Sequence, residues 1–486
     1  MTGAPSGTRQ WPAIPVALAA MLVALAINHA GYRGGGADDW QYLEAARCAV
    51  AQHGLCAPPS HWWARFPLVA PMALVLAIGG ESRLTLGIVP LLYAAAAIGL
   101  FTLLVERWFG RAAAMLGGPL MATLPVLSLI LLQPNVDTAE LPFMLAALLA
   151  FDKAARGGRF MAIAGGALLG LAILTRPSAL ALLPILALAA AATPKLRRLV
   201  LPAALGLAAM LAAEMAAYWL WLGDPLRSWA LSLDHTAIPS AELPPGFHSA
   251  RGPLFNPDYI AAWRPAMGIH VHWTIDPILN LLASPAVGPL LIAALLLLGL
   301  RRPSPRETQG RLLLWLLGGA ILWFGAITYA FAIDPKPRMF LPVAAAAAAI
   351  FAVQSVGLWH EGRKAIVAAL AAILVAMNLF YAATIPDLRA LEPPAEQWVR
   401  EFGPTLAVDD ASRRFLTLVP GVRALPVDPP GAAHYMIVAL GPCDGVARFR
   451  AGWHIERASV TTTPAGEQAS LCLFRKDEGP AAAPRR

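Results

Sequence analysis

The sequence predicts an all-α polytopic membrane protein with a small C-terminal α/β domain. Of its 486 residues, 58% are hydrophobic and only 14% are charged, whereas a soluble domain carries about 25% charged residues. The hydrophobic residues also gather in runs close to the roughly 20 residues that cross the hydrocarbon of a bilayer as a helix. Because backbone groups inside lipid must hydrogen-bond to one another, we expect these runs to be helices.

About eleven runs are predicted to span the membrane. The first follows a single basic residue, Arg9, and has no clear small-residue cleavage site after it, so we expect an uncleaved span and not a signal peptide. The apolar stretch 67–78 is too short to span and is predicted to be a half-inserted or interfacial helix. The predicted spans are about 11–30, 84–105, 112–132, 140–155, 160–175, 178–193, 199–222, 281–300, 312–332, 339–358 and 365–383.

Basic residues are concentrated in the loops on one side of these spans. Since successive spans alternate in direction, five such loops share a side with the N-terminus, and the positive-inside rule makes this side cytoplasmic. The same bias accounts for the formal net charge of +8. The sequence contains no Lys/Arg stripe interleaved with aromatic residues, which is the pattern that would indicate nucleic-acid binding. The loops carry Arg107 and Arg111; Lys153, Arg156 and Arg159; Lys195, Arg197 and Arg198; Arg301, Arg302, Arg306 and Arg311; and Arg363 with Lys364.

Three larger segments fall on the opposite side: 31–66, 223–280 and the chain from about 384 onward. We therefore divide the chain into a membrane domain at 1–383 and an exported domain at 384–486. A segment of about 100 residues can bury a core of its own.

The exported domain shows both strand and helix patterns. Residues 405–408, 435–440 and 470–474 are predicted to be strands, and 394–402 and 412–419 to be helices. An adjacent acidic pair, Asp409 and Asp410, ends the first strand, where a helix cap is the better interpretation than a second active site.

All four cysteines lie on the outer side, two in the first loop and two in the C-terminal segment. Even numbers in an exported compartment indicate disulfides, most simply Cys48–Cys56 and Cys443–Cys472. The alternative is four free, buried thiols.

An acidic pair, Asp38 and Asp39, follows the first span and is itself followed by Tyr42. Charge close to hydrocarbon is costly and rarely idle. Two carboxylates at a membrane surface suit removal of a proton from an acceptor hydroxyl, or binding of a metal. The structural alternative is that Asp38 caps a helix running through Ala45 and Cys48.

A second acidic site, Asp137 and Glu140, follows the third span, and its three-residue spacing places both side chains on one helix face. The alternative is an N-cap for the fourth span, a role expected of Asp137 in any case.

Three basic residues lie on the outer side, where topology does not call for cations: Arg176, Lys336 and Arg338. They suit a phosphate at headgroup depth. The alternative is snorkelling to lipid headgroups.

The order of these motifs resembles the GT-C glycosyltransferases that use lipid-phosphate sugars, especially the bacterial relatives of protein O-mannosyltransferases and of aminoarabinose transferase. The resemblance covers about residues 10–385. Two motifs lie in the first outer loop: the acidic pair with its Tyr at 38–42, and HWWARFPLVAP at 61–71, which resembles the family's His-Pro-Pro-Leu stretch. Asp137 stands at the family's second acidic position. Two later motifs are GGALLGLAILTRP at 165–177, with Arg176 in place of the family's Lys, and Pro337-Arg338-Met339, which resembles its Arg-Tyr.

The resemblance implies a GT-C-like fold and an inverting transfer of a sugar from a polyprenyl-phosphate donor to a periplasmic lipid, glycan or protein. Asp38 or Asp39 would act as base, with Asp38 favoured. Arg176, Lys336 and Arg338 would stabilise the departing phosphate.

Tyr42, Asp137, Glu140 and His61 would position donor and acceptor in the implied site. The enzyme would lie in the bilayer of a bacterial inner membrane, with the C-terminal domain periplasmic. No cofactor is expected, and a divalent metal is compatible with the acidic pair but not indicated.

The long outer loop holds Trp229, Trp263 and Trp273, which suit either sugar stacking or an interfacial belt. It also holds His270 and His272, for which the sequence offers no third metal ligand nearby.

Two other functions fit a polytopic chain. A transporter or flippase would need polar residues at mid-membrane and repeated, broken helices, whereas the charges here gather at the outer ends. A scaffold without activity would leave the outer acidic and basic residues without a purpose.

Overall fold

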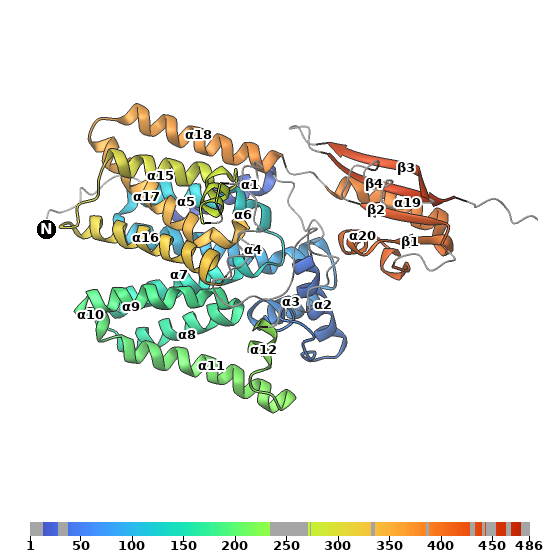
Figure 1. Ribbon diagram of the computed structural model, residues 1–486, viewed down its shortest axis with the longest axis horizontal. Helices are drawn as coiled ribbons and strands as arrows, with labels where there is room; N and C mark the ends of the chain where they lie inside the picture. Colours follow the sequence, from blue (N-terminus) through green and yellow to red (C-terminus); the bar gives the residue numbers. More distant parts are fainter. Residues whose placement is uncertain are drawn as a thin grey trace, which may run out of the picture.

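The computed structural model describes residues 13–27, 37–233, 271–272, 274–331, 336–384, 388–427, 433–439, 443, 453–462 and 468–477. Within these ranges a body of helices is followed by a small domain built on a sheet (Figure 1). The prediction of a mostly helical chain with a small mixed α/β region at its C-terminal end is confirmed.

The first half of the helical body runs from α1 to α12, with one 3₁₀ helix, η1. Its elements are α1 (Ala13–Ile27), α2 (Ala37–Ala51), α3 (Phe66–Gly79), α4 (Arg83–Phe109), α5 (Arg111–Ala122), α6 (Pro125–Ile130), α7 (Val136–Ala154), α8 (Arg159–Thr175), η1 (Pro177–Ala181), α9 (Leu182–Ala192), α10 (Pro194–Arg197), α11 (Val200–Leu222) and α12 (Arg227–Leu233).

The second half begins after the long loop at 223–280, most of which lies outside the described residues. Its elements are α14 (Asp276–Ala283), α15 (Gly288–Leu300), α16 (Thr308–Gly325), a π-helical turn η3 (Ala326–Ala330), a 3₁₀ turn η4 (Pro337–Phe340), α17 (Leu341–His360) and α18 (Lys364–Ala383).

Five helical stretches in the described chain are long and apolar enough to cross a membrane, or six if α14 and α15 count as one broken span. The five are α4, α11, α16 with η3, η4 with α17, and α18. The chain is thus a multi-span membrane protein by length and composition. The helices α1, α8 and α9 occupy other predicted spans but are shorter, so the full count of about eleven stays a prediction.

Two predicted spans are wrong as continuous helices, and proline explains both. The span at 112–132 is divided between α5 and α6, because Leu124 is held extended by Pro125, which begins α6. The span at 281–300 bends by 100° between α14 and α15. Ser284 is extended there, and the residue after it is Pro285.

The helices α7, α8 and α11 pack side by side, with α8 between the other two. Glycines permit the close approach of α8 and α11. A Cβ on Gly166 would collide with the backbone carbonyl of Ala203, and a Cβ on Gly206 with that of Ile163. Membrane helices associate largely through such close contacts of small residues, because lipid gives no hydrophobic drive between them.

The C-terminal domain is a four-stranded mixed sheet in the order β1-β2-β4-β3. β1 pairs in parallel with β2, while β4 is antiparallel to β2 and β3. Trp398 and Phe415 from the domain's helices pack on one face against Leu406, Ile437 and Leu471. The elements are η5 (Leu388–Leu391), α19 (Glu392–Phe402), η6 (Gly403–Thr405), β1 (Leu406–Val408), α20 (Asp410–Phe415), η7 (Val422–Ala424), β2 (Tyr435–Ala439), β3 (Trp453–Thr462) and β4 (Gln468–Lys476).

The three predicted strands are confirmed as β1, β2 and β4, but β3 was missed. Its residues alternate between half-buried and exposed, and most of them are polar, so the strand carries only a weak apolar signal. The predicted helix at 412–419 is shorter and earlier, as α20. Asp409 caps it by accepting from the backbone N–H of Ser412, which confirms the cap interpretation.

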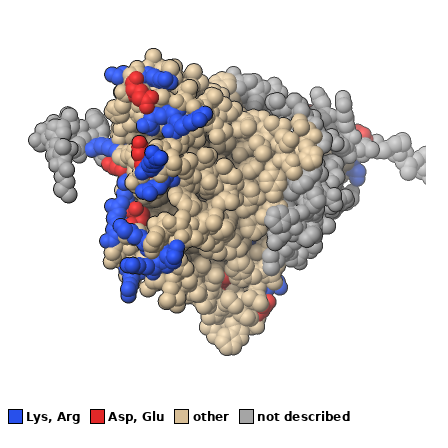
Figure 2. Space-filling model, turned by 60° about the vertical axis from the view of Figure 1, so that its left-hand side comes forward, with Lys and Arg blue, Asp and Glu red and all other residues tan. Residues whose placement is uncertain are grey.

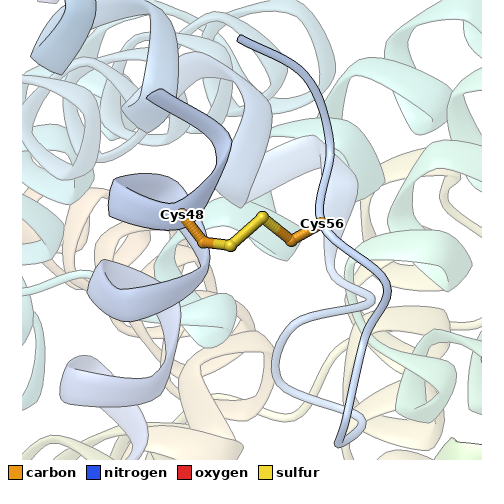
Figure 3. Close-up of a disulfide and its surroundings, with 2 residues drawn as sticks. All are labelled: Cys48 and Cys56. Carbon is orange, nitrogen blue, oxygen red and sulfur yellow. A yellow bond between two sulfur atoms is a disulfide. The ribbon is translucent and has the colours of Figure 1, made fainter. Parts of the chain in front are cut away.

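Both predicted disulfides are present. Cys48 at the end of α2 bonds to Cys56, and Cys443 bonds to Cys472 on β4. Their Cα atoms are 6.1 and 5.7 Å apart, within the ordinary range. Figure 3 shows the first bond joining the helix to the following loop.

Lys and Arg gather at one end of the helical body (Figure 2). This is the end where α10 lies, and the sheet domain lies at the opposite end (Figure 1). The described structure therefore separates a basic end from the end that carries α2, α3 and the sheet.

Candidate functional site

The first acidic pair lies in the first turn of α2, at the end of the helical body nearer the sheet domain. The predicted helix through Ala45 and Cys48 is present. Asp38 is its second residue, so it does not cap the helix as the alternative supposed. The Asp38 side chain is 30% exposed, whereas Asp39 is buried. Asp38 is therefore the carboxylate of the pair that a ligand can reach.

The second acidic position lies at the start of α7. Here the predicted cap is wrong, because the N-cap is Asn135, whose side chain accepts from the backbone N–H of Asp137 at 2.8 Å. An asparagine cap satisfies the free backbone donor without using a charge. The carboxylate of Asp137 is thereby left to face the cations.

The two arginines come from the ends of distant helices. α8 ends at Thr175, because the residue before a proline avoids helical geometry and Pro177 follows Arg176. Arg338 lies in η4, which begins at Pro337 and leads into α17. Both arginines therefore lie at the end of a helix: Arg176 directly after α8, and Arg338 in the turn before α17.

An unbroken chain of ion pairs joins these four residues. Arg338 pairs with Asp38, and its Nε atom lies 3.4 Å from an Asp137 oxygen. Arg176 pairs with the other oxygen of Asp137. The side chains of Asp137 and Arg176 are only 4% and 12% exposed, so the ion pair between these two residues is largely shielded from solvent and strong. The structure thus brings together acids and bases that lie up to 300 residues apart in sequence.

Two tryptophans fold back from the first loop onto α2. The indole N–H of Trp62 donates to Asp38 at 3.1 Å, and that of Trp63 donates to Gln41 at 3.0 Å. The ring of His61 lies against that of Trp62, with centroids 4.0 Å apart. His61 therefore contacts Trp62, and Trp62 in turn contacts Asp38.

Tyr42 is buried one turn after Asp38. Burial raises the pKa of its phenol, and the charge of Asp38 raises it further, while Arg65, Arg176 and Arg338 oppose the shift. The phenol is therefore neutral at physiological pH, and it lies within electrostatic reach of Asp38 and of the three arginines.

Arg65 is a site residue that sequence reasoning missed. It is 6% exposed, and no ion pair or hydrogen bond holds its guanidinium among the residues that the structure describes. Burial lowers its pKa, and the nearby carboxyl group of Glu214 opposes this shift. A buried cation without a close counter-ion is costly. The signal was available, since Arg65 is a further arginine on the outer side, placed directly before an apolar helix.

The two remaining predicted residues lie at the edges of this cluster. Glu140 is buried one turn below Asp137 and accepts a hydrogen bond of 3.2 Å from the Ser178 hydroxyl. Lys336 is exposed at the start of η4, two residues from Arg338. Glu140 is thus a buried, hydrogen-bonded residue next to the cluster, and Lys336 lies at the surface of the protein.

An apolar cavity of about 470 Å³ is lined by residues that lie close in sequence to two of the arginines. Its lining comes from α3, α4, α7, α8 and α11, and the lining residues Ala64 and Phe66 flank Arg65. Leu174, two residues before Arg176, also lines it. Further lining residues are Tyr93, Phe143, Leu171, Met210 and Glu214.

Other sequence candidates contribute less. Among the described residues no group of three or more His, Cys, Asp or Glu could hold a metal ion. His270, Trp263 and Trp273 lie outside the described residues. Trp229 donates to Glu214 at 3.2 Å, so its N–H is used within the protein.

Residues 67–221 match the family model described as dolichyl-phosphate-mannose-protein mannosyltransferase. No curated protein sequence matches the chain.

Solved structures match the chain over most of its length. ArnT from Cupriavidus metallidurans in the apo state is 14% identical, with a TM-score of 0.53 over 95% of this chain and 97% of ArnT. The same protein bound to undecaprenyl phosphate is 16% identical over the same shares, with a TM-score of 0.49. An oligosaccharyltransferase from Archaeoglobus fulgidus, in complex with zinc and sulfate, is 14% identical, with a TM-score of 0.55 over 96% of this chain and 74% of that protein.

The resemblance expected from the motifs is confirmed by these matches. The matched segment includes Asp137, Glu140 and Arg176, and the chain shares the fold of ArnT and of the archaeal oligosaccharyltransferase over about 95% of its length. At 14% identity the solved structures establish the fold alone. The roles of individual residues are argued from the geometry described above.

Proposed function

We propose that this protein transfers a sugar from a polyprenyl-phosphate donor to a hydroxyl of a periplasmic lipid, glycan or protein. The reaction inverts the anomeric centre, and Asp38 is the base. The proposal is supported by the match of residues 67–221 to the dolichyl-phosphate-mannose-protein mannosyltransferase model, because dolichyl-phosphate-mannose is a lipid-phosphate sugar. The Cupriavidus protein, which shares the fold, is also known with undecaprenyl phosphate bound.

The observation that carries the proposal is the meeting of opposite charges from distant helix ends, together with an apolar cavity whose lining residues Ala64 and Phe66 flank Arg65. An acid reachable by an acceptor, Asp38, contacts Arg338, which is shared with the buried Asp137. Glycosyl transfer to a hydroxyl needs one group to accept a proton and others to receive the phosphate that leaves. A lipid-linked donor also needs an apolar surface for its chain.

The proposed step moves one proton and exchanges one bond. Asp38 takes the proton of the acceptor hydroxyl as its oxygen attacks the anomeric carbon. The bond from that carbon to the phosphate oxygen breaks, and the electron pair leaves with the lipid phosphate. Arg176, Arg338 and Arg65 stabilise the charge that gathers there, with Lys336 at the surface.

Binding of the donor changes the partners of Arg338. In the structure this arginine divides its charge between Asp38 and Asp137. A donor phosphate offers it a third anion and draws it from Asp38, which leaves that carboxylate free to accept a proton. Arg65 has no such partner to give up, so it is the cation that is ready for the phosphate before the donor arrives.

The remaining site residues hold this arrangement in place. Asp137 orients Arg176 and Arg338, and Glu140 anchors the start of α7 to Ser178. Tyr42 offers a neutral phenol beside Asp38. Asp39 adds negative charge near Arg338, and His61 supports Trp62.

The sidedness of the protein follows from charge. The basic end is proposed to be cytoplasmic by the positive-inside rule, and the site with the sheet domain to face the periplasm of a bacterial inner membrane. Two disulfides near the site end agree with an oxidising compartment.

The test uses purified protein in detergent with a panel of radiolabelled polyprenyl-phosphate hexoses and pentoses and an extract of envelope lipids and glycans. We expect labelled sugar to enter an acceptor and free lipid phosphate to appear in equal amount. Asp38→Asn should abolish both while expression and thermal unfolding stay normal. Arg400→Ala, in an exposed pair on α19, is the control.

Two outcomes contradict the proposal in different ways. If liposomes containing the protein move the labelled lipid across the bilayer without releasing lipid phosphate, a flippase is the better description. Near-normal turnover by Asp38→Asn would remove Asp38 as the base and leave the reaction itself standing.

A further inference from the structure

Both oxygens of the Asp38 carboxylate are held by N–H donors from different parts of the chain. The Trp62 indole donates to Oδ1 at 3.1 Å. Arg338 pairs with Oδ2. The two donors differ in kind, because an indole N–H carries no charge, whereas the charged Arg338 is shared with Asp137.

The Trp62 ring is fixed by its surroundings. It is 7% exposed and packs in the hydrophobic cluster between α2 and α3, with Tyr42, Leu43 and Leu68. The ring of His61 covers part of it at a tilt of 31°. A tightly packed aromatic ring has few rotamers open to it, so the direction of its N–H is set before any ligand binds.

The segment that carries Trp62 is tied to α2 at two further places. Trp63 donates to Gln41, one helical turn after Asp38, and Cys56 is bonded to Cys48, farther along the same helix. Residues three apart on a helix share a face. The segment from Cys56 to Trp63 therefore runs back along α2 and delivers adjacent indoles to adjacent turns.

We propose that Trp62 is a positioning residue for the base: it holds Asp38 through Oδ1, so that only Oδ2 is presented to the acceptor. This inference rests on the function proposed above. When the phosphate of the donor draws Arg338 away, the indole is the donor that stays, and the carboxylate keeps its direction. The acceptor hydroxyl then delivers its proton to the oxygen that Arg338 has left.

The experiment compares Trp62→Phe with its neighbour Trp63→Phe, using the donor of the panel that gives the highest turnover. Both variants lose an indole N–H to α2, but only the first loses one to Asp38. Replacing Trp62 by 3-benzothienylalanine keeps the size of the ring and removes the N–H alone, which guards against a packing defect in Trp62→Phe. Asp38→Asn is measured in parallel.

We expect Trp62→Phe and the benzothienyl variant to lower kcat by about 10- to 100-fold, the range for a lost hydrogen bond to a charged group. The KM for the donor should change less than about threefold, because Trp62 is not proposed to touch the donor. Trp63→Phe should keep kcat within about threefold of the wild type. A merely structural role would instead lower the melting temperature and kcat of both variants alike.

Two results would overturn the inference, and they are distinguishable. If the benzothienyl variant matches the wild type while Asp38→Asn is inactive, Trp62 does not position the base, and the proposed function is untouched. If Asp38→Asn is itself active, the proposed base is wrong, and the role of Trp62 falls with it.

Discussion

Arg47 on α2 donates a hydrogen bond of 2.7 Å to the hydroxyl of Thr417 in the C-terminal domain. The same guanidinium pairs with Glu44 and Glu81 and lies over the ring of Trp40. Glu81 in turn pairs with Arg423, also in the C-terminal domain. A second link joins Arg83 at the start of α4 to Glu392 at the start of α19. The helix that carries Asp38 is thereby attached to the sheet domain.

Arg47→Ala should loosen this attachment. It removes two ion pairs and the bond to Thr417, and we expect a loss of about 1–2 kcal/mol, since partly exposed pairs contribute well under 1 kcal/mol each. Limited proteolysis should cut more rapidly between α18 and α19 in the variant. Arg400→Ala, whose pair is 74% exposed on the arginine side, is the control. Equal cleavage of both variants would show that the attachment depends on other contacts.

Asp137→Asn should destabilise the protein and alter its response to ligand. The substitution leaves Arg176 and Arg338 facing each other without the shared carboxylate, at a cost of about 3 kcal/mol for a broken buried pair. Polyprenyl phosphate should raise the melting temperature of this variant more than that of the wild type, because the phosphate replaces the lost anion. Asp152→Asn, at the basic end beside Arg107, should not show this gain. A melting temperature unchanged by Asp137→Asn would mean that the pairs contribute nothing to folding.

Arg65→Met should separate stability from binding. Methionine fills a similar volume and removes a buried cation that lacks a close partner, so the melting temperature should stay level or rise. The KM for the donor should rise about 10- to 100-fold if Arg65 receives the phosphate. Arg227→Met, which loses only a 3.4 Å bond to the Pro58 carbonyl, is the matched control on the outer side. A donor KM equal to that of the wild type would exclude Arg65 from the phosphate site.

The two disulfides should differ in their effect on turnover. Loop-closure entropy gives about 2.5 kcal/mol for the Cys48–Cys56 bond and about 3.5 kcal/mol for the longer Cys443–Cys472 loop. Serine replacement of the first pair should also lower kcat, because the bond holds the segment that carries Trp62 against α2. Replacement of the second pair should mainly lower the stability of the sheet domain. The opposite order of effects on kcat would place the sheet domain closer to the chemistry than proposed here.

Gly166→Ala should separate α8 from α11. The added methyl group would meet the Ala203 carbonyl, a backbone atom that cannot turn aside, so we expect a loss of about 2–3 kcal/mol or poor membrane insertion. Gly318→Ala on α16 meets nothing within 4 Å and should be neutral or slightly stabilising, because alanine favours helix. Their melting temperatures in detergent test the contrast. Similar values would mean that α8 and α11 can adjust by moving apart.

The sequence by itself determined the class of the protein and the sidedness of its charges. Long apolar runs have one stable form in lipid, the helix, so the membrane class followed from composition alone. Both disulfides followed from the grouping of cysteines in two outer segments. The sequence also predicted two local features correctly: the helix cap at Asp409 and the helix that has the first acidic pair in its first turn.

Only the tertiary structure decided which charges meet. Arg338 and Asp38 are 300 residues apart, and no local pattern states that a turn before α17 will reach the first turn of α2. The predicted helix cap at Asp137 was wrong, because the position of a cap depends on backbone geometry, and Asn135 occupies that position instead. Sequence reasoning also missed Arg65 and Trp62, because the roles proposed for them depend on the residues that surround them in the folded protein. Ion pairs and directed hydrogen bonds act over a few ångströms, so they are fixed by packing between distant segments, whereas burial in lipid acts on each segment by itself.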